Sequence, residues 1–456
     1  MRPIVWRFLV VSSLLLAALG AQAETRPQYG GTLHIALRAA PISLDPADST
    51  QGNSFAQHSI TLLMLETLVS MDDSGRIHGV LATSWQASSG NARWQFHLRR
   101  GVKFHDGTAL SGELVAASLR VANPAWKLTV DGDSFVIECD GPDPDLLAEL
   151  AQPRYAIAKR NPDKPIGTGP FHVVAWQPGK KLTLAAEEDY WRGRVFLDGI
   201  EIEMGKSFRD QMTALELGRA DLVEVAPEQT HRVSLEGRRI VSSAPAELLA
   251  LLFARDTQTP EETSLREALA LSVERASIRS VLLQGAGQPA GGALPNWMSG
   301  YSFVFSTDAD LTRARHTREQ FRAVPAWTLG YDGGDPLARL LADRIALNGK
   351  DAGLSLQPTS TGTPDLRLVR IPLLSADPWI ALAEVSTLCG IPPAKDKSKT
   401  IEDLYAAEQA LLATRRIIPL FHLPVSYAAA AALENWNVRP DGTLSLADAW
   451  LRSGKP

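Results

Sequence analysis

The sequence predicts a mixed α/β fold, because segments with strand periodicity alternate along the chain with segments of helical periodicity. Residues 32–37 and 94–98 alternate polar and apolar side chains, as half-buried strands do. Residues 54–69 and 110–121 place apolar side chains three or four positions apart, which is typical of amphipathic helices. Turn residues separate these segments, and the sequence contains neither an internal repeat nor a low-complexity tract.

The clearest helical pattern covers residues 265–283. A stripe of apolar side chains begins at Leu265, and Thr263 or Ser264 is placed to cap the N-terminus of the helix. The glycines within residues 285–289 end the pattern, as a loop would. We therefore expect one long helix followed by a flexible loop.

Length and composition indicate a large, ordinary globular protein. The chain has 456 residues, of which 45% are hydrophobic and 21% charged, and its length favours two or three domains. The formal net charge is −5, and the basic residues are not clustered as they are in proteins that bind nucleic acid. A nucleic-acid partner is therefore not expected.

The N-terminus has the pattern of a secretory signal peptide. Arg2 and Arg7 precede the apolar residues 8–19, a run shorter than the roughly 20 residues that a membrane-spanning helix needs. The run leads into a small-x-small sequence that places cleavage after Ala23. An uncleaved membrane anchor is the alternative. Because no cysteine near this position could accept a lipid, we expect a soluble periplasmic protein that begins at Glu24.

Two cysteines, Cys139 and Cys389, stand far apart in the sequence. An oxidising compartment would permit them to pair. A disulfide would require their Cα atoms to lie within about 7 Å of each other. We expect two separate, mostly buried thiols.

Motifs of the common enzyme classes are missing. The sequence contains no H-E-x-x-H, C-x-x-C, G-x-S-x-G or P-loop motif. The nine histidines are scattered, and none has another at the spacing that places two metal ligands on one helical face. His105 stands beside Asp106 as an acid–base pair would, but a turn before Gly107 explains the pair better. We expect no catalytic residue, no metal site and no cofactor.

A series of ordered motifs gives a more specific indication. They are Gly30–Ala36, Ile42–Pro46, Glu66–Leu68, Leu81–Trp85, Phe96–Gly107, Pro165–Phe171, Asp189–Gly193, Leu197–Ile200, Leu217–Asp221 and Leu265–Leu269. In this order they resemble the extracellular solute-binding proteins of the dipeptide, oligopeptide and nickel class of ABC transporters. The resemblance covers nearly the whole mature chain.

The resemblance implies a two-lobed periplasmic-binding-protein fold of class II, the peptide-binding type, with a hinge and a central ligand cleft. The expected division is a signal peptide at 1–23, a first lobe at 24–245 with an inserted subdomain at about 47–164, a second lobe at 246–424, and a return to the first lobe at 425–456. The apolar residues 417–420 are expected to form the strand that carries the chain back. His422, which follows them, is expected to be structural.

Most of the matching motifs are expected to serve the fold. Gly167 and Gly169 permit backbone shapes that a Cβ resists, and Pro170 fixes a tight connection. Tyr190 and Trp191 are expected to pack against that connection rather than to contact a solute.

The expected ligand depends on residues 365–379. In peptide-binding relatives this stretch is typically an Asp, a strand ending in Trp, an Asp that pairs with the peptide amine, and a closing Asp-Pro. An ungapped alignment from Asp365 to Asp377 puts Ile371 in place of the Trp and Leu374 in place of the amine-binding Asp. An insertion would let Asp377 take that role, but the ungapped alignment is favoured. Because a buried ammonium without a carboxylate costs several kcal/mol, a peptide with a free amine is not favoured.

We therefore expect a small ligand, neutral or acidic, held between the lobes. The predicted contacts from the first lobe are Pro41, Ile42 and Ser43, and those from the second lobe are Ile371, Leu374, Asp377 and Trp379. The expected role is that of a monomeric binding component that delivers its solute to ABC-transporter permease subunits. The alternative is a degenerate scaffold or sensor that recognises a protein. An exported hydrolase would need a nucleophile and base that the sequence does not show.

Overall fold

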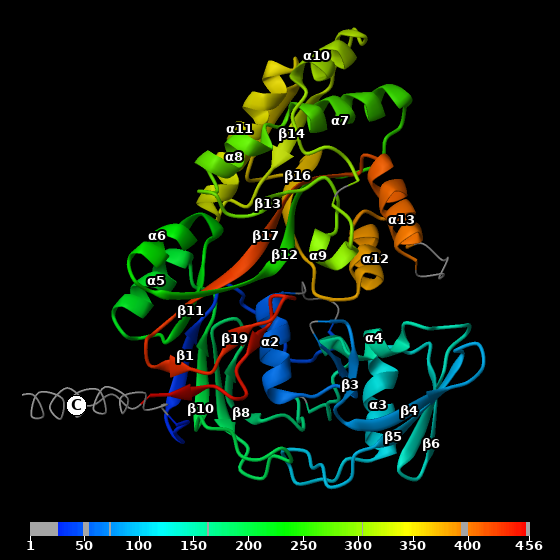
Figure 1. Ribbon diagram of the computed structural model, residues 1–456, viewed down its shortest axis with the longest axis vertical. Coiled ribbons are helices and arrows are strands. Elements are labelled where there is room, and N and C mark those ends of the chain that lie inside the picture. The colour runs from blue at the N-terminus through cyan, green and yellow to red at the C-terminus, as the bar shows by residue number, and fades with distance from the viewer. Residues whose placement is uncertain are drawn as a thin grey trace, which may run out of the picture.

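The computed structural model describes residues 26–48, 54–72, 74–161, 164–302, 304–393 and 400–452. The predicted signal peptide at 1–23 lies outside these residues. The described chain forms a lower body built around β1 and β8–β10 and an upper body built around β14–β16, which we call the first and second lobes (Figure 1). Helices and strands alternate in both lobes, so the predicted mixed α/β class is confirmed.

One sheet of eleven strands runs through both lobes, in the order β15-β14-β16-β12-β17-β11-β1-β10-β9-β8, with β13 paired to β17. Its strands are β1 (Thr32–Ala36), β8 (Phe171–Gln177), β9 (Lys181–Ala186), β10 (Gly199–Glu203), β11 (Leu222–Val225), β12 (Arg239–Phe253), β13 (Gln288–Pro289), β14 (Ala326–Gly330), β15 (Ser355–Thr359), β16 (Leu366–Pro372) and β17 (Ile417–Ala429). The chain therefore passes between the lobes on β12 and β17.

The two crossing strands are irregular where the lobes meet. β12 and β17 pair antiparallel, with register shifts on both sides of Pro245, which lies opposite Pro424. Neither proline has an N–H to give to the ladder, and bulges of this kind bend a strand and increase its twist. The irregular pair lies at the predicted boundaries 245/246 and 424/425. The division into moving units itself stays a prediction.

The first lobe packs helices on both faces of its part of the sheet. α2 (Phe55–Met64) covers one face, and α5 (Phe208–Glu216) and α6 (Thr230–Leu235) cover the other. The short C-terminal strands β18 (Leu433–Glu434), β19 (Asn437–Val438), β20 (Leu444–Ser445) and β21 (Trp450–Leu451) return to this lobe. Leu433, Trp436 and Leu444 are part of its main core. A one-turn 3-10 helix, Pro227–Gln229, precedes α6.

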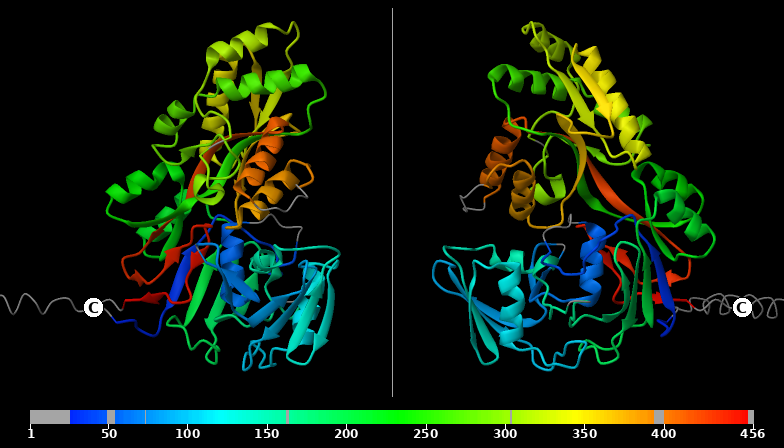
Figure 2. Two further views of the ribbon diagram at one scale, coloured as in Figure 1. Left: turned by 45° about the vertical axis from the view of Figure 1, so that its right-hand side comes forward. Right: turned by 180° about the vertical axis from the view of Figure 1, so that it is seen from behind.

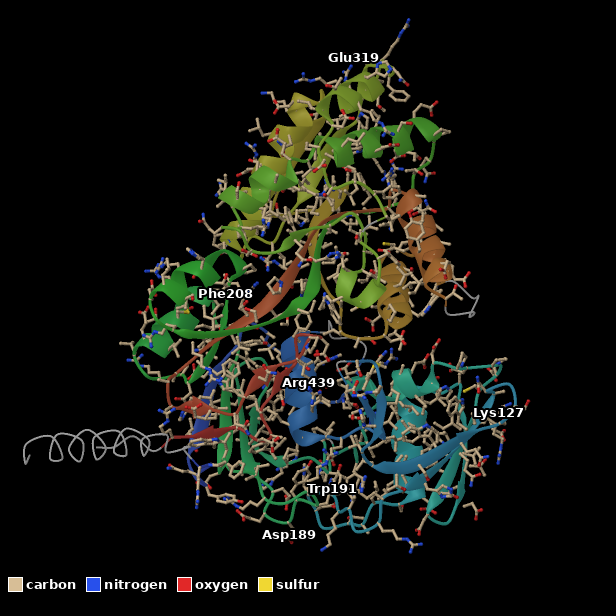
Figure 3. All side chains as sticks on the ribbon, viewed as in Figure 1. Lys127, Asp189, Trp191, Phe208, Glu319 and Arg439 are labelled. Carbon is tan, nitrogen blue, oxygen red and sulfur yellow. The ribbon has the colours of Figure 1, made fainter. Side chains whose placement is uncertain are left out.

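A smaller sheet forms a subdomain beside this core. It has the order β4-β5-β7-β6, and Lys127 marks its outer edge in Figure 3. Its elements are β4 (Ala82–Ala87), β5 (Arg93–Leu98), α3 (Gly112–Ala122), β6 (Lys127–Asp131), β7 (Ser134–Glu138), α4 (Leu146–Leu150) and the 3-10 helix Pro153–Tyr155, preceded by the hairpin of β2 (Val69–Met71) and β3 (Ile77–Gly79). Phe96 stacks on Phe135 across the sheet at 5.2 Å between ring centroids.

The second lobe has a separate core on each face of the sheet, and Figure 2 shows its helices on both faces. Its helices are α7 (Pro260–Ser272), α8 (Arg275–Val281), α9 (Asn296–Ser299), α10 (Leu311–Glu319), α11 (Pro336–Asp351), α12 (Pro378–Leu388) and α13 (Ile401–Ala413). Along β12, Leu249 and Leu251 face the core with α7, α10 and α11, and Leu248 and Ala250 face the core with α9, α12 and α13. This alternation follows the period of two in a strand.

The prediction of one helix over residues 265–283 is wrong. α7 begins at Pro260, five residues before the predicted start at Leu265, and Thr259 caps it by accepting a hydrogen bond from the Glu262 N–H at 3.2 Å. The backbone then becomes extended at Val273, and α8 starts separately at Arg275. Thr259 and Glu262 have the spacing of a capping box, with a proline at the first helical position, and that signal was missed.

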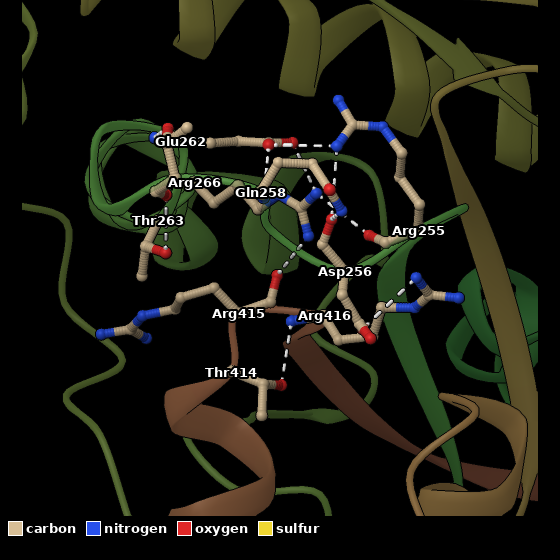
Figure 4. A network of polar contacts seen from close by, with 10 residues as sticks. Arg255, Asp256, Gln258, Glu262, Thr263, Arg266, Thr414, Arg415 and Arg416 are labelled. Carbon is tan, nitrogen blue, oxygen red and sulfur yellow. Dashed lines mark hydrogen bonds and ion pairs between the residues drawn. The ribbon is translucent and has the colours of Figure 1, made fainter.

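The Leu265–Leu269 motif contains a buried arginine that joins three elements (Figure 4). The Arg266 side chain is 1% exposed and donates to the Glu262 carboxylate at 2.7 Å and to the Arg255 carbonyl at 3.0 Å. Its guanidinium also lies 4.0 Å above the Phe253 ring, and it donates to the Arg415 carbonyl at 3.4 Å. The motif therefore ties α7 to the end of β12 and the start of β17.

The two cysteines lie in different lobes. Cys139 follows β7 in the subdomain, and Cys389 caps the C-terminus of α12, where it is buried. Both residues are described, and they form no disulfide with each other, as expected. Within the described ranges, every helix is too short or too polar to cross a bilayer.

Candidate ligand-binding cleft

A cavity lies between the two lobes. It consists of two adjoining pockets of about 350 and 290 Å³ that share Arg38, Ser54, Phe55, Glu247 and Arg370. The larger pocket extends along the second lobe, and its lining includes Asp332, Asp335, Leu341 and Pro372. The smaller pocket extends along the first lobe and β17, and its lining includes Phe208, Glu224, Pro227 and Val425. We call the two pockets together the interlobe cavity.

Arg38 forms much of the first-lobe wall, two residues after β1. Its backbone N–H donates to the Glu224 carboxylate at 2.6 Å, and its guanidinium lies 4.7 Å above the Phe208 ring. Gln211 donates to the same carboxylate at 3.1 Å. Burial raises the pKa of Glu224, and the hydrogen bonds from Arg38 and Gln211 oppose this rise.

Arg370 on β16 is the centre of the second-lobe wall. Its guanidinium contacts the Glu247 carboxylate at 3.2 Å and the Asp335 carboxylate at 3.3 Å. Burial acts to lower the pKa of Arg370, but the neighbouring carboxylates outweigh burial and raise it. The other oxygen of Asp335 caps α11 by accepting from the Leu337 and Ala338 N–H groups at 3.0 and 3.4 Å. The helix start therefore fixes this carboxylate in the wall.

One ion pair within the cavity crosses from lobe to lobe. Arg38 Nη2 and Asp332 Oδ2 are 3.9 Å apart, a separation at which the charges attract but form no hydrogen bond. The Asp332 side chain is 64% exposed, so water screens the pair.

Closer to the protein interior, Glu228 Oε2 is buried and has no hydrogen-bond partner among the described residues. Burial raises the pKa of Glu228.

None of the seven predicted contacts is among the residues that line this cavity, but Leu374 packs beside it. Leu374 is 5% exposed and packs between the lobes against Phe55, Ala246 and Val425. Phe55 and Val425 also line the cavity. Leu374 therefore packs where the two lobes meet, next to the cavity, and its contact with a ligand stays a prediction.

The other second-lobe candidates lie apart from the cavity. Ile371 is buried in the core beneath α12 and α13. Asp377 caps α12 by accepting from the Trp379 and Ile380 N–H groups at 2.9 and 3.1 Å, and burial raises its pKa. Trp379 lines an apolar pocket of about 250 Å³ between α12 and α13.

The first-lobe candidates lie elsewhere again. Ile42 and Ser43 line a surface pocket of about 830 Å³ together with Arg160 and Lys164, and Ile42 is 68% exposed. The Pro41 carbonyl accepts from the Gly179 N–H at 2.8 Å, next to this pocket. Contact of the seven residues with a ligand stays a prediction.

Sequence reasoning missed the charged lining of the interlobe cavity: Arg38, Glu247, Asp332, Asp335 and Arg370. One signal was present in the sequence. Asp332-Gly333-Gly334-Asp335-Pro336 has the form of a turn followed by a capped helix start, which places carboxylates at the rim of a strand. The arginines have no comparable signal, because they acquire their positions through pairing between distant strands.

The aromatic motif is structural, as expected. Gly167 and Gly169 are structural for a different reason from the expected one: neither has a positive φ, but a Cβ would lie 2.1 Å from Met64 O at Gly167 and 2.6 Å from Met64 C at Gly169. Glu66 accepts hydrogen bonds from Thr168 at 2.9 Å, from Tyr190 at 2.8 Å and from Trp191 at 2.7 Å. Burial raises the pKa of Glu66 against these hydrogen bonds. Figure 3 shows Trp191 at the base of the first lobe, far from the second, whereas Phe208 lies at the level where the lobes meet.

The histidines singled out in the sequence also have structural roles. The ring of His105 accepts from the Gly167 N–H at 3.3 Å, and its other nitrogen lies 3.0 Å from the Gly169 carbonyl, just before the turn at Gly107. His422 is buried beside the Ala293 carbonyl at 3.2 Å. In the part of the chain that the structure describes, no three His, Cys, Asp or Glu side chains gather as metal ligands would.

Comparison with solved structures supports the fold. A dipeptide-binding protein from Pseudoalteromonas sp. SM9913, solved with Met-Leu, superposes with a TM-score of 0.80 at 17% identity and covers 92% of this chain and 100% of its own. NikA from Staphylococcus aureus, solved with Ni(L-His)2, superposes with a TM-score of 0.77 at 17% identity, with the same coverage of both chains. The predicted two-lobed, class II peptide-binding type of fold is confirmed.

Comparison with known sequences identifies the family. The nickel-binding protein NikA of Staphylococcus aureus is 27% identical over 49% of each chain. The probable D,D-dipeptide-binding periplasmic protein DdpA of Escherichia coli is 24% identical over 67% of this chain, and this chain spans 65% of DdpA. Residues 76–363, more than half of the chain, match the description "Bacterial extracellular solute-binding proteins, family 5 Middle". The chain therefore belongs to the bacterial extracellular solute-binding proteins of family 5.

Proposed function

We propose that this protein is the periplasmic binding component of an ABC transporter, which captures a small solute between its lobes and delivers it to the membrane permease. The observation that carries the proposal is the interlobe cavity, whose charged lining comes from both lobes of a family 5 chain. Sites at lobe interfaces gain selectivity by surrounding the solute.

The names of the relatives support a small polar solute. They include a glutathione-binding protein of Pectobacterium atrosepticum and a di/tripeptide-binding protein of Pseudomonas aeruginosa, in addition to the nickel-binding and dipeptide-binding proteins above. A cavity of a few hundred Å³ fits solutes of this size. The family consists of solute-binding proteins, and we propose that this chain likewise acts by binding and not by catalysis.

The crossing strands provide a hinge for this function. The register shifts around Pro245 locally free β12 and β17 from the regular ladder, so rotation there costs few hydrogen bonds. Rotation about this point moves Arg38 and Asp332 toward or away from each other, since they lie on opposite sides of the cavity. Closure would therefore bring the charged walls together around the solute.

Family membership places the chain in the extracellular or periplasmic space. We propose in addition that residues 1–23 are removed as a signal peptide and that the mature protein carries no lipid. The permease subunits then dock to a freely diffusing binding protein.

Native mass spectrometry of freshly purified protein, combined with small-angle scattering, tests the proposal. We expect a retained or added small molecule to bind with one-to-one stoichiometry and to lower the radius of gyration, because closure draws the lobes together. A protein that neither retains a small molecule nor binds any from a periplasmic metabolite extract would contradict the proposed function.

A further inference from the structure

We propose that the transported solute carries a cationic nitrogen, an ammonium or a guanidinium, which binds the carboxylates of Glu247 and Asp332 in the interlobe cavity, with Asp335 adding negative charge beside them. This inference rests on the proposed function. It names the chemical class of the solute and the residues that select it.

The charges that line the cavity are not balanced. Two arginines, Arg38 and Arg370, face four carboxylates, those of Glu224, Glu247, Asp332 and Asp335. Glu224 is held by protein donors on the first-lobe side and is set apart from the other three. Even without Glu224, three carboxylates face two guanidinium groups. A cationic group of the solute would restore the balance of charge.

The arginines have limited capacity for an anionic solute. Arg370 already contacts two carboxylates, at 3.2 and 3.3 Å, so an incoming anion would have to compete with both. Arg38 is stacked on Phe208 and lies 3.9 Å from Asp332. An anion would therefore enter a site whose net charge is also negative, where one partly engaged guanidinium, that of Arg38, could bind it. The free energy of hydration that the anion loses on leaving water would not be recovered.

Acceptor oxygens remain for a cation. Asp332 Oδ1 accepts from the Gly334 N–H at 2.9 Å, whereas Oδ2 has only the distant Arg38. Glu247 contacts Arg370 through Oε2, and within the described chain its Oε1 has no hydrogen-bond partner. A carboxylate accepts through both oxygens, so each of these side chains retains a free acceptor that an N–H donor can use.

The buried oxygen of Glu228 independently favours a donor in this region. Glu228 interacts electrostatically with Arg370, Asp335 and Arg38, and its Oε2 is shielded from water without a partner among the described residues. A buried acceptor without a donor is costly, and a cation nearby reduces that cost.

These carboxylates differ from the one that the alignment finds missing. Leu374 leaves the usual amine position apolar, whereas Asp332 and Asp335 lie at the start of α11 and Glu247 lies on β12. The solute would thus present its cation toward β16 and α11. A neutral or acidic solute, as the sequence favours, is the competing outcome.

Calorimetry with one skeleton in three charge states tests the inference. The probes are alanylalaninamide, which is cationic, N-acetylalanylalaninamide, which is neutral, and N-acetylalanylalanine, which is anionic; agmatine supplies a second cationic skeleton. We expect at least one cationic probe to bind at least about tenfold more tightly than the neutral and anionic probes, the ratio that about 1.4 kcal/mol gives. Added salt should weaken this binding.

A matched pair of variants identifies the residues. Asp332→Asn should weaken binding of the cationic probe by about tenfold. Asp133→Asn, equally exposed at 64% but located in the turn between β6 and β7 of the subdomain, should leave it unchanged. Melting temperatures of both variants show whether either is unfolded. If Asp332→Asn does not fold, the relative affinities of the wild-type protein for the cationic, neutral and anionic probes decide whether the solute carries a cation.

The outcomes separate this inference from the proposed function. Tighter binding of the neutral or anionic probe, or a copurified solute without a cationic nitrogen, overturns the inference and leaves the solute-binding function intact. Failure of both cationic probes to bind also overturns it when another solute binds. If the protein binds no solute of any charge, both proposals fall.

Discussion

Glu384 on α12 provides a quantitative test of how the lobes are packed. Burial raises the pKa of its carboxyl from 4.5 to about 7, and the positive charge of Arg154 only partly opposes the rise. Arg154 belongs to the 3-10 helix of the first lobe, so this electrostatic interaction acts between residues of different lobes. The pKa of Glu384 therefore reports on the approach of α12 to the first lobe.

The magnitude follows from this shift. One pKa unit corresponds to about 1.4 kcal/mol, so the rise from 4.5 to about 7 corresponds to about 3 kcal/mol. The folded protein holds the proton more tightly than the unfolded chain. Preferential protonation of Glu384 in the folded state therefore stabilises the protein fully below pH 4.5, and this stabilisation is lost as the pH rises through about 7. Glu384→Gln removes this loss, because glutamine stays neutral.

Denaturant titrations of wild type and Glu384→Gln between pH 4 and pH 8 measure the effect. The two free energies of unfolding should be similar at low pH, and by about pH 8 the variant should be more stable by up to about 3 kcal/mol. Glu188→Gln, at an exposed position, is the control and should show no such divergence. Parallel pH profiles for wild type and Glu384→Gln would refute the burial of this carboxyl.

Three further outcomes are expected. Glu66→Gln should lower the free energy of unfolding by at least about 1.5 to 3 kcal/mol, because the glutamine NH2 cannot accept and at least one of the three donors loses its acceptor. Unchanged denaturation curves would argue against this network. Leu374→Asp should lower the melting temperature by burying a carboxylate against Phe55, and a stable variant with a new preference for free-amine peptides would show that the cleft hydrates this position. N-terminal sequencing of the exported protein should begin at Glu24, and an intact Met1 in a membrane pellet would contradict export by cleavage.

Short-range patterns predicted the elements well where one period dominates. The strand at 94–98 and the helix at 110–121 were found to within two residues, because their apolar positions repeat cleanly. The break between α7 and α8 was missed, since the apolar stripe continues across Val273 although the backbone does not. Periodicity detects a buried face and is insensitive to a bend that keeps this face buried.

The site was harder to predict for a different reason. The alignment singled out Leu374, which packs beside the cavity and whose contact with a ligand stays a prediction. Arg38 and Arg370 line the cavity but have no local pattern to mark them. Arg38 reaches the cavity because β1 is paired between β10 and β11, and Arg370 because β16 is paired with β12. Such neighbours are set by sheet order, which a single sequence does not specify.

The return of the chain to the first lobe has a consequence for biogenesis. β17 completes the sheet beside β11, and Leu433, Trp436 and Leu444 fill the main core around β1 and α2. The first lobe therefore cannot complete its core until residues 417–451 have been synthesised, and the whole second lobe is made in between. This chain connectivity delays folding of the first lobe until nearly all of the polypeptide has been made, which would suit a chain that crosses a membrane in the unfolded state.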